Sequence, residues 1–221
     1  MRGGEALLRS TGVPRDGHEP PRGFEAMRGR PRWLIDPVSV GLWVFMGVAT
    51  ALFSLFLFAY VMRIAGGDAA AIAWPKQVWL STALLALAGI AMQRAARTGP
   101  SRDEAAARRA LIAGGLLAMA FIGVQLWTWS ILSQAQVRLN GNPMGSFFYL
   151  LSAMHGLHVL GGLAGWAVAV HAAARGDDAR AARLARLCAR YWHFLLFVWV
   201  VLFAALAGIT PELAARLCGV Q

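Results

Sequence analysis

The stretch MGSFFYLLSAMHGLHVLGGLAGWAVAVHAA, residues Met144–Ala173, decides the fold of this chain. It runs for 30 residues without an Asp, Glu, Lys or Arg, whereas a helix needs roughly 20 apolar residues to cross a bilayer core. Irregular backbone in contact with lipid would leave polar groups unpaired, so such a stretch predicts a transmembrane helix.

Four further apolar segments accompany this stretch along the chain. They are Pro37–Met62, Val78–Ala96, Ala110–Ser133 and Tyr191–Gly208. The whole chain of 221 residues is 58% hydrophobic and only 14% charged, whereas a soluble domain carries about 25% charge. These features predict an all-α integral membrane protein, a bundle of five transmembrane helices.

The basic residues indicate how the bundle is oriented. There are 21 Lys and Arg against 11 Asp and Glu, a formal net charge of +10. Three alternate segments hold 17 of the 21: the N-terminal tail and the loops after the second and fourth spans. Basic residues favour the cytoplasmic side, which predicts a cytoplasmic N-terminus and a periplasmic C-terminus. A nucleic-acid partner is excluded, because the basic residues lie at span ends without a binding motif.

The same pattern divides the chain into three parts. We expect residues 1–36 to form a flexible basic cytoplasmic tail, because they are rich in Arg, Gly and Pro and lack helical periodicity. Residues 37–208 form the membrane domain, and residues 209–221 a short periplasmic tail. No apolar region of a signal peptide precedes the first span.

Polar side chains inside the spans are the candidate functional groups, because burying them in hydrocarbon is costly. They are Gln125, Thr128, His155, His158 and His193. His155 and His158 lie three residues apart and share one helix face. With His193 they suggest a metal or haem site. From the predicted span ends, however, His158 lies ~20 Å and His193 only ~5 Å above the inner ends of their helices. That difference favours structural hydrogen bonding.

Small residues predict close helix packing on the same span. Gly161 and Gly165 form a Gly-x-x-x-Gly pair, and Ser152 and Gly156 form a second pair of small residues. Such positions let helices approach closely, and polar side chains beside them can bond across the interface.

What the spans lack also bears on function. None contains a carboxylate, which argues against a proton pump or a proton-coupled carrier. No phosphate-binding loop, zinc signature or nucleophile–base pair occurs either. The chain therefore shows no catalytic, cofactor-binding or metal-binding residues of its own.

Several motifs resemble those of one family, the subunit III family of haem–copper oxidases (cytochrome c oxidase subunit 3). The fourth span has an aromatic pair followed by His155-Gly156-Leu157-His158-Val159, and the fifth begins Tyr191-Trp192-His193-Phe194. The first span resembles the family's entry helix. Gly123, Gln125 and Trp129 match its Gly-x-Gln-x-x-Glu-aromatic stretch. The resemblance covers about residues 37–208 and corresponds to the five-helix form of the family.

The departures from the family pattern all concern acids. Ala49 stands where the family usually has a Glu in the first helix, a residue thought to help proton uptake by the catalytic subunit. Thr128 replaces a second Glu, and Leu196 replaces the Asp that commonly follows Tyr-Trp-His-Phe.

The resemblance implies a non-catalytic membrane subunit of a haem–copper terminal oxidase in aerobic respiratory electron transport. Its implied partners are the catalytic subunit I and subunit II, which would hold haem and copper, together with membrane phospholipid. Its implied location is the bacterial cytoplasmic (inner) membrane, as a multi-pass protein. His155, His158, Gln125 and His193 would tie the third to fifth spans together.

Three alternatives remain open from the sequence. The chain could be a subunit-III-like accessory protein of a nitric oxide reductase. It could be an independent haem-b electron carrier. It could also be a small transporter or an assembly factor.

Overall fold

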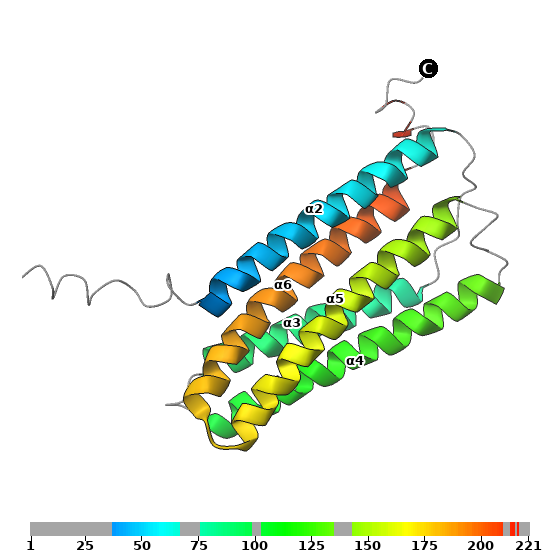
Figure 1. Cartoon of the computed structure of the whole chain (residues 1–221). Helices are drawn as coiled ribbons and strands as arrows, with labels where there is room; N and C mark the ends of the chain where they lie inside the picture. Colours follow the sequence, from blue (N-terminus) through cyan, green and yellow to red (C-terminus); the bar gives the residue numbers. More distant parts are fainter. Residues whose placement is uncertain are drawn as a thin grey trace, which may run out of the picture.

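Five long helices make up the membrane domain in the computed structural model, which describes residues 37–66, 76–98, 103–134, 143–209, 213, 214 and 216. Within this part of the chain the helices are α2 (Pro37–Ala65), α3 (Gln77–Arg97), α4 (Glu104–Gln134), α5 (Pro143–Ala174) and α6 (Asp178–Gly208), and no strand occurs (Figure 1). Each helix is long and apolar enough to cross a membrane. The prediction of an all-α protein with five membrane-spanning helices is confirmed.

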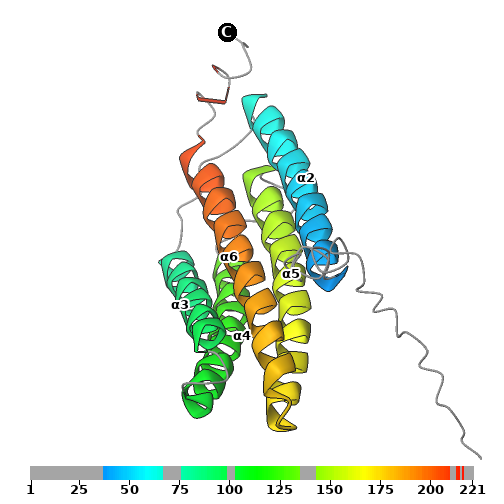
Figure 2. The same ribbon diagram turned by 90° about the vertical axis from the view of Figure 1, so that its left-hand side faces the viewer.

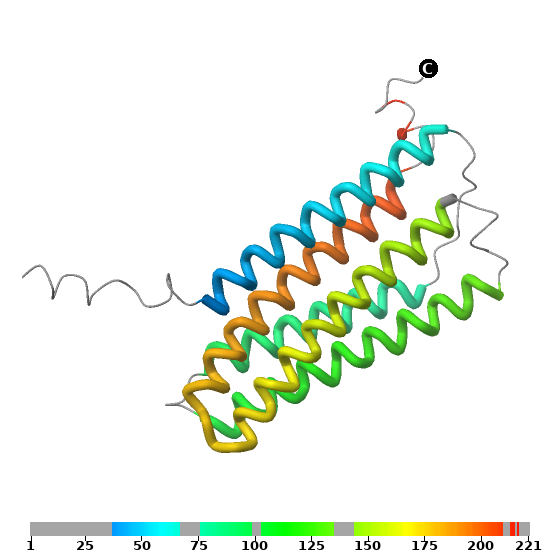
Figure 3. The backbone as a smooth tube through the Cα atoms, viewed as in Figure 1, coloured from blue at the N-terminus to red at the C-terminus, as the bar shows by residue number. Residues whose placement is uncertain are grey.

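The helices run alternately up and down in one elongated bundle (Figures 1 and 3). The start of α2 and the α5–α6 turn lie at one end, and the end of α6 lies at the other. Seen from the side, α6 lies between α3 and α2 (Figure 2). The predicted tail of residues 1–36 lies outside the described residues, as does most of the predicted tail 209–221.

Helix α6 is longer than the apolar segment that was predicted to span the membrane. Helix α6 begins at Asp178, 13 residues before the predicted start at Tyr191. The added segment is rich in Ala, Leu and Arg, which are strong helix formers even where they are too polar for lipid. Ala181, Ala185 and Cys188 are buried along one face of it. The helix therefore continues beyond the apolar run from which its start was predicted.

A tight turn permits this early start. Gly176 has φ +74°, a backbone conformation that side-chain-bearing residues rarely adopt. Asp177 follows as the N-cap of α6, and its side chain accepts a hydrogen bond of 3.1 Å from the backbone N–H of Arg180. The α5 and α6 helices are consequently connected as an antiparallel pair.

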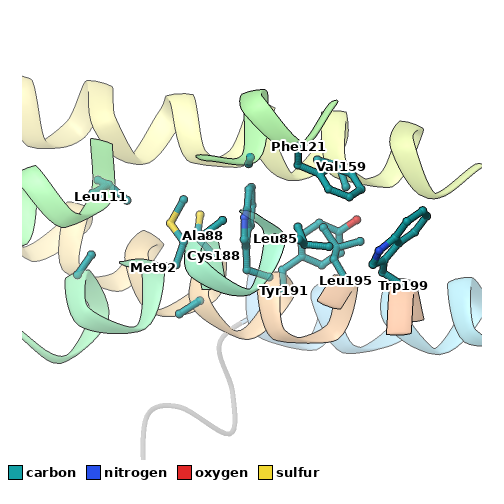
Figure 4. Packing of buried hydrophobic residues seen from close by; sticks show 14 of the residues in the cluster. Leu85, Ala88, Met92, Leu111, Phe121, Val159, Cys188, Tyr191, Leu195 and Trp199 are labelled. Carbon is teal, nitrogen blue, oxygen red and sulfur yellow. The ribbon is translucent and has the colours of Figure 1, made fainter. Parts of the chain in front are cut away.

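The core of the bundle is centred on α6. In an apolar stretch of 18 residues within α6, 44% is buried, compared with 17% in the corresponding stretch of α2. Figure 4 shows side chains from four helices gathered in this core: Leu85, Ala88 and Met92 of α3, Leu111 and Phe121 of α4, Val159 of α5, and Cys188, Tyr191, Leu195 and Trp199 of α6. Helix α2 joins the bundle by packing against α5 and α6. A buried hydrogen bond of 3.3 Å from the Tyr60 hydroxyl to the carbonyl of Leu206 links α2 to the end of α6.

Candidate functional site

His155 lies where four helices meet. Its side chain is 0% exposed. The ring of Phe53 from α2 is 6.4 Å away between centroids, that of Phe121 from α4 is 5.7 Å away, and that of Trp199 from α6 is 5.1 Å away. Neither ring nitrogen of His155 has a hydrogen-bond partner among the described residues. The side chain is thus a polar group enclosed by aromatic rings.

His158 lies one turn further along α5 and faces α2. Its ring centroid is 5.7 Å from that of Phe45 and 5.2 Å from that of Phe53. Nδ1 lies 2.7 Å from the carbonyl oxygen of Met154 in its own helix. The backbone carbonyl of His158 accepts a hydrogen bond of 3.0 Å from the Tyr191 hydroxyl of α6. His158 therefore lies at the junction of α2, α5 and α6.

The two polar residues predicted on α4 are both buried but differ in their partners. Thr128 donates a 2.9 Å hydrogen bond to the carbonyl of Val124, so its hydroxyl is satisfied within its own helix. Gln125 is only 5% exposed, and neither atom of its amide group has a partner among the described residues. Gln125 and His155 consequently share an unusual condition, because buried polar groups in proteins are nearly always hydrogen-bonded.

His193 does not join the other histidines. Its side chain is exposed on α6, and Nδ1 lies 2.7 Å from the carbonyl oxygen of Ala189 one turn earlier. We expected a large difference in depth between His158 and His193, and this expectation is wrong. Helix α6 starts at Asp178, and the Tyr191 hydroxyl bonds to the His158 carbonyl. His193, two residues after Tyr191, therefore lies at nearly the same depth as His158. Direction rather than depth separates His193 from His155, since one side chain points outward and the other is buried.

Tyr191 and Trp192 connect α6 to α5. Trp192 is 0% exposed, and a Cβ added to Gly162 would lie 2.7 Å from its ring atom Cζ3. The predicted small residues behave differently, because an added Cβ at Gly156, Gly161 or Gly165 would meet nothing within 4 Å. Among the described glycines of α5, the close approach to a neighbouring helix thus occurs at Gly162.

Sequence reasoning missed the residues that link the helices by tryptophan N–H groups. Trp166 donates to the carbonyl of Leu111 at 2.7 Å, Trp129 to Ser152 Oγ at 3.0 Å, and Trp199 to Thr82 Oγ1 at 3.0 Å. These bonds connect α5 to α4, α4 to α5 and α6 to α3. Tryptophans in a membrane helix also serve as interfacial anchors, so the sequence carries no signal that separates the two roles.

A shallow apolar groove lies between α2, α5 and α6 at the end of the bundle that holds the start of α2. It has a volume of about 340 Å³, and its lining includes Val38, Phe45, Gly161, Gly165, Cys188 and Trp192. On the other side of the α2–α6 contact, the Arg190 guanidinium lies 5.5 Å from the Trp43 ring and donates a 3.0 Å hydrogen bond to Ser39 Oγ. Apolar surface and a basic side chain thus lie close to each other at one end of the bundle.

The described residues can be assessed for a metal site or cofactor site. Among the residues that the structure describes, no group of three His, Cys, Asp or Glu side chains is placed to hold a metal ion. The surroundings of His155 are aromatic rings of the chain's own helices. This composition is compatible with a chain that carries no cofactor.

Comparisons with known proteins place the chain among oxidase subunits. The family described as "Cytochrome c oxidase subunit III" matches residues 69–207. A probable cytochrome c oxidase subunit 3 of Nocardia farcinica is 27% identical over 180 residues, which cover 76% of this chain and 86% of the relative. A probable quinol oxidase subunit 3 of Staphylococcus saprophyticus is 31% identical over 180 residues, covering 75% and 86%. A probable cytochrome c oxidase subunit 3 of Mycobacterium tuberculosis is 27% identical over the same length.

Proposed function

The chain belongs to the cytochrome c oxidase subunit III family, and from this premise we propose how it serves its complex. It is a non-catalytic membrane subunit of a haem–copper oxidase. Its role there is to support the assembly and stability of the catalytic subunit. The nitric oxide reductase alternative is not favoured, because the relatives bear the names of cytochrome c oxidase and quinol oxidase subunits.

One structural observation favours a structural role of this subunit over a catalytic role. The mid-membrane polar residues Gln125, Thr128 and His155 are all buried within the chain's own bundle. The exposed faces carry large apolar side chains instead, such as Leu55, Leu157 and Phe197. A subunit built in this way presents mainly apolar surface to its neighbours, with His193 as an exposed polar exception.

The partners follow from the family and from the exposed surface. Catalytic subunit I, with subunit II, would hold the haem and copper of the complex. Phospholipid would occupy the groove between α2, α5 and α6, with an acyl chain against Phe45 and Gly161. The basic loops support a cytoplasmic N-terminus and a periplasmic C-terminus in the bacterial inner membrane.

The replaced acids limit what the chain contributes to proton uptake. Ala49 is 1% exposed on α2, and Thr128 is 0% exposed on α4. Leu196 is half-buried on α6. None of these side chains can bind or release a proton, so the subunit supplies no carboxylate to the catalytic subunit at these positions.

Co-purification tests the proposed function directly. The chain is tagged, extracted from its native membrane in mild detergent, and the proteins and pigments that accompany it are identified. We expect larger oxidase subunits and a haem Soret band that does not come from this chain. A colourless chain purified alone would contradict the oxidase-subunit role, whereas a Soret band on the isolated chain would indicate an electron carrier.

Replacing a buried histidine should reduce the amount of complex without changing its haem. We expect His155→Leu to lower the yield of assembled complex several-fold. The substitution removes a ring that packs against Phe53, Phe121 and Trp199, and destabilised subunits are removed before assembly. The haem spectrum of the surviving complex stays unchanged. His171→Leu is the matched control, since His171 lies on the same helix but is exposed, and its yield should equal that of the parent. A shifted haem spectrum in a fully assembled His155→Leu complex would contradict the structural role.

A further inference from the structure

Besides the indole N–H of Trp192, two buried polar side chains on neighbouring helices have no partner in the described part of the chain. They are Gln125 on α4, 5% exposed, and His155 on α5, 0% exposed. Leaving such a group unsatisfied in an apolar interior is strongly unfavourable. Four separate atoms are affected, the amide oxygen and nitrogen of Gln125 and both ring nitrogens of His155. A shared partner for these atoms would remove the penalty on both sides.

The antiparallel register of α4 and α5 sets the two side chains at one level. Trp129 of α4 bonds to Ser152 of α5 at 3.0 Å. Two turns earlier on α4, the Phe121 ring packs against His155 at 5.7 Å between centroids. Gln125 lies four residues from each of these α4 residues and so on the same helix face. Gln125 therefore lies level with the turn of α5 that runs from Ser152 to His155.

The protons of the neighbouring hydroxyl and indole groups are already donated elsewhere. The Thr128 hydroxyl donates to Val124, and the Trp199 N–H donates to Thr82 Oγ1. The Ser152 hydroxyl donates to the carbonyl of Phe148 and accepts from Trp129. The rings of Phe53, Phe121 and Trp199 lie around His155 on its other sides. These neighbours have no proton left for the Gln125 oxygen or the His155 ring, and a small polar molecule between the two side chains can supply one.

We propose that a water molecule binds inside the bundle between α4 and α5 and bridges the Gln125 amide to the His155 imidazole. Water fits the chemistry, because it donates two and accepts two hydrogen bonds, whereas a neutral imidazole offers one donor and one acceptor. Buried waters of this kind commonly satisfy polar groups that the chain itself leaves unpaired. The site is internal to this chain and does not depend on the role proposed for the subunit.

Water-edited solid-state NMR on the full chain in lipid nanodiscs tests the site without any substitution. Magnetisation that starts on water should reach the Gln125 side-chain amide and the His155 ring nitrogens several-fold faster than it reaches Ala118 or Leu132. Those two residues are buried on the same helix as Gln125 and carry apolar side chains. Equal transfer to all four residues, or a direct Gln125–His155 hydrogen bond without transfer from water, would overturn the proposal.

A double-mutant cycle tests the coupling that the bridge requires. Gln125→Leu and His155→Phe are made singly and together, and the unfolding midpoint of the full chain in nanodiscs is followed by tryptophan fluorescence. Each single change leaves the other group unpaired, so we expect midpoints lower by about 3–8 °C. The double variant should fall by clearly less than the sum of the single effects. Additive effects, or a single change that raises the midpoint, would contradict the bridge.

Thr128→Val is the matched control for this cycle. Thr128 is as buried as Gln125 and lies nearly one turn away on α4, but its hydroxyl bonds within its own helix. Combined with His155→Phe it should give additive midpoint shifts. Coupling of similar size for Thr128 would mean that the cycle measures general repacking, and the bridge would be rejected.

Discussion

Substituting Ala for Gly115 is expected to cause the largest loss of stability among single conservative changes in this chain. A Cβ at this position would overlap ring atoms of Trp166, among them Cε2 and Cζ2. The indole cannot move away freely, because its N–H donates a 2.7 Å hydrogen bond to the Leu111 carbonyl of α4. We expect a free energy of unfolding lower by about 2–4 kcal/mol, from overpacking and the strained or lost hydrogen bond. The unfolding midpoint in nanodiscs should fall by roughly 5–15 °C.

Gly123→Ala is the matched control, because it makes the same chemical change on the same helix. A Cβ at Gly123 would meet nothing within 4 Å. Alanine favours helix over glycine by about 1 kcal/mol in helix interiors, so the control should keep or slightly raise the midpoint. If Gly115→Ala and Gly123→Ala had equal midpoints, the close contact between α4 and Trp166 would be refuted.

The second large effect is expected from Gly162→Ala at the contact between α5 and α6. The added Cβ would lie 2.7 Å and 2.9 Å from Cζ3 and Cη2 of Trp192, and 3.0 Å from Cε1 of Tyr191. Trp192 is completely buried, so its ring has no free space to enter. We expect a loss of about 1–3 kcal/mol in the free energy of unfolding, measured as the midpoint of thermal unfolding.

The neighbouring residue provides the control, and a second substitution provides a rescue. Gly161→Ala should leave the midpoint unchanged, because nothing lies within 4 Å of its added Cβ. Trp192→Phe removes the ring atoms that clash, so Gly162→Ala should lose less stability in that background than in the parent. Equal losses in both backgrounds would show that the penalty arises elsewhere.

The five spans could be predicted because each is a consequence of composition alone. A run such as Met144–Ala173 must be helical in a bilayer whatever it contacts, since its backbone groups have no other partners there. The start of α6 could not be predicted in the same way. Residues 178–190 are too polar to belong to an apolar span, although their Ala, Leu and Arg favour helix. Their packing, with Ala181 and Cys188 buried, is not visible in hydropathy.

The candidate site was predicted in its members but not in its geometry. Polar residues such as Gln125 and His155 were identified because a polar side chain within a span is rare. The aromatic rings around His155 come from α2, α4 and α6, far apart in sequence. The outward direction of His193 likewise depends on which face of α6 contacts α3 and α5.

Residue type therefore determined the class of this protein, the number of its spans and the polar residues within them, because the cost of burying charge in lipid acts on each segment separately. The motifs in α5 and α6 also identified the family. Tertiary structure alone decided that Gly114, Gly115 and Gly162 lie in close contacts while Gly161 and Gly165 are open. It also decided that His155 is enclosed while His193 is exposed. These properties depend on the rotation of each helix about its own axis, and that rotation is set by the side chains of the neighbouring helices rather than by the helix's own sequence.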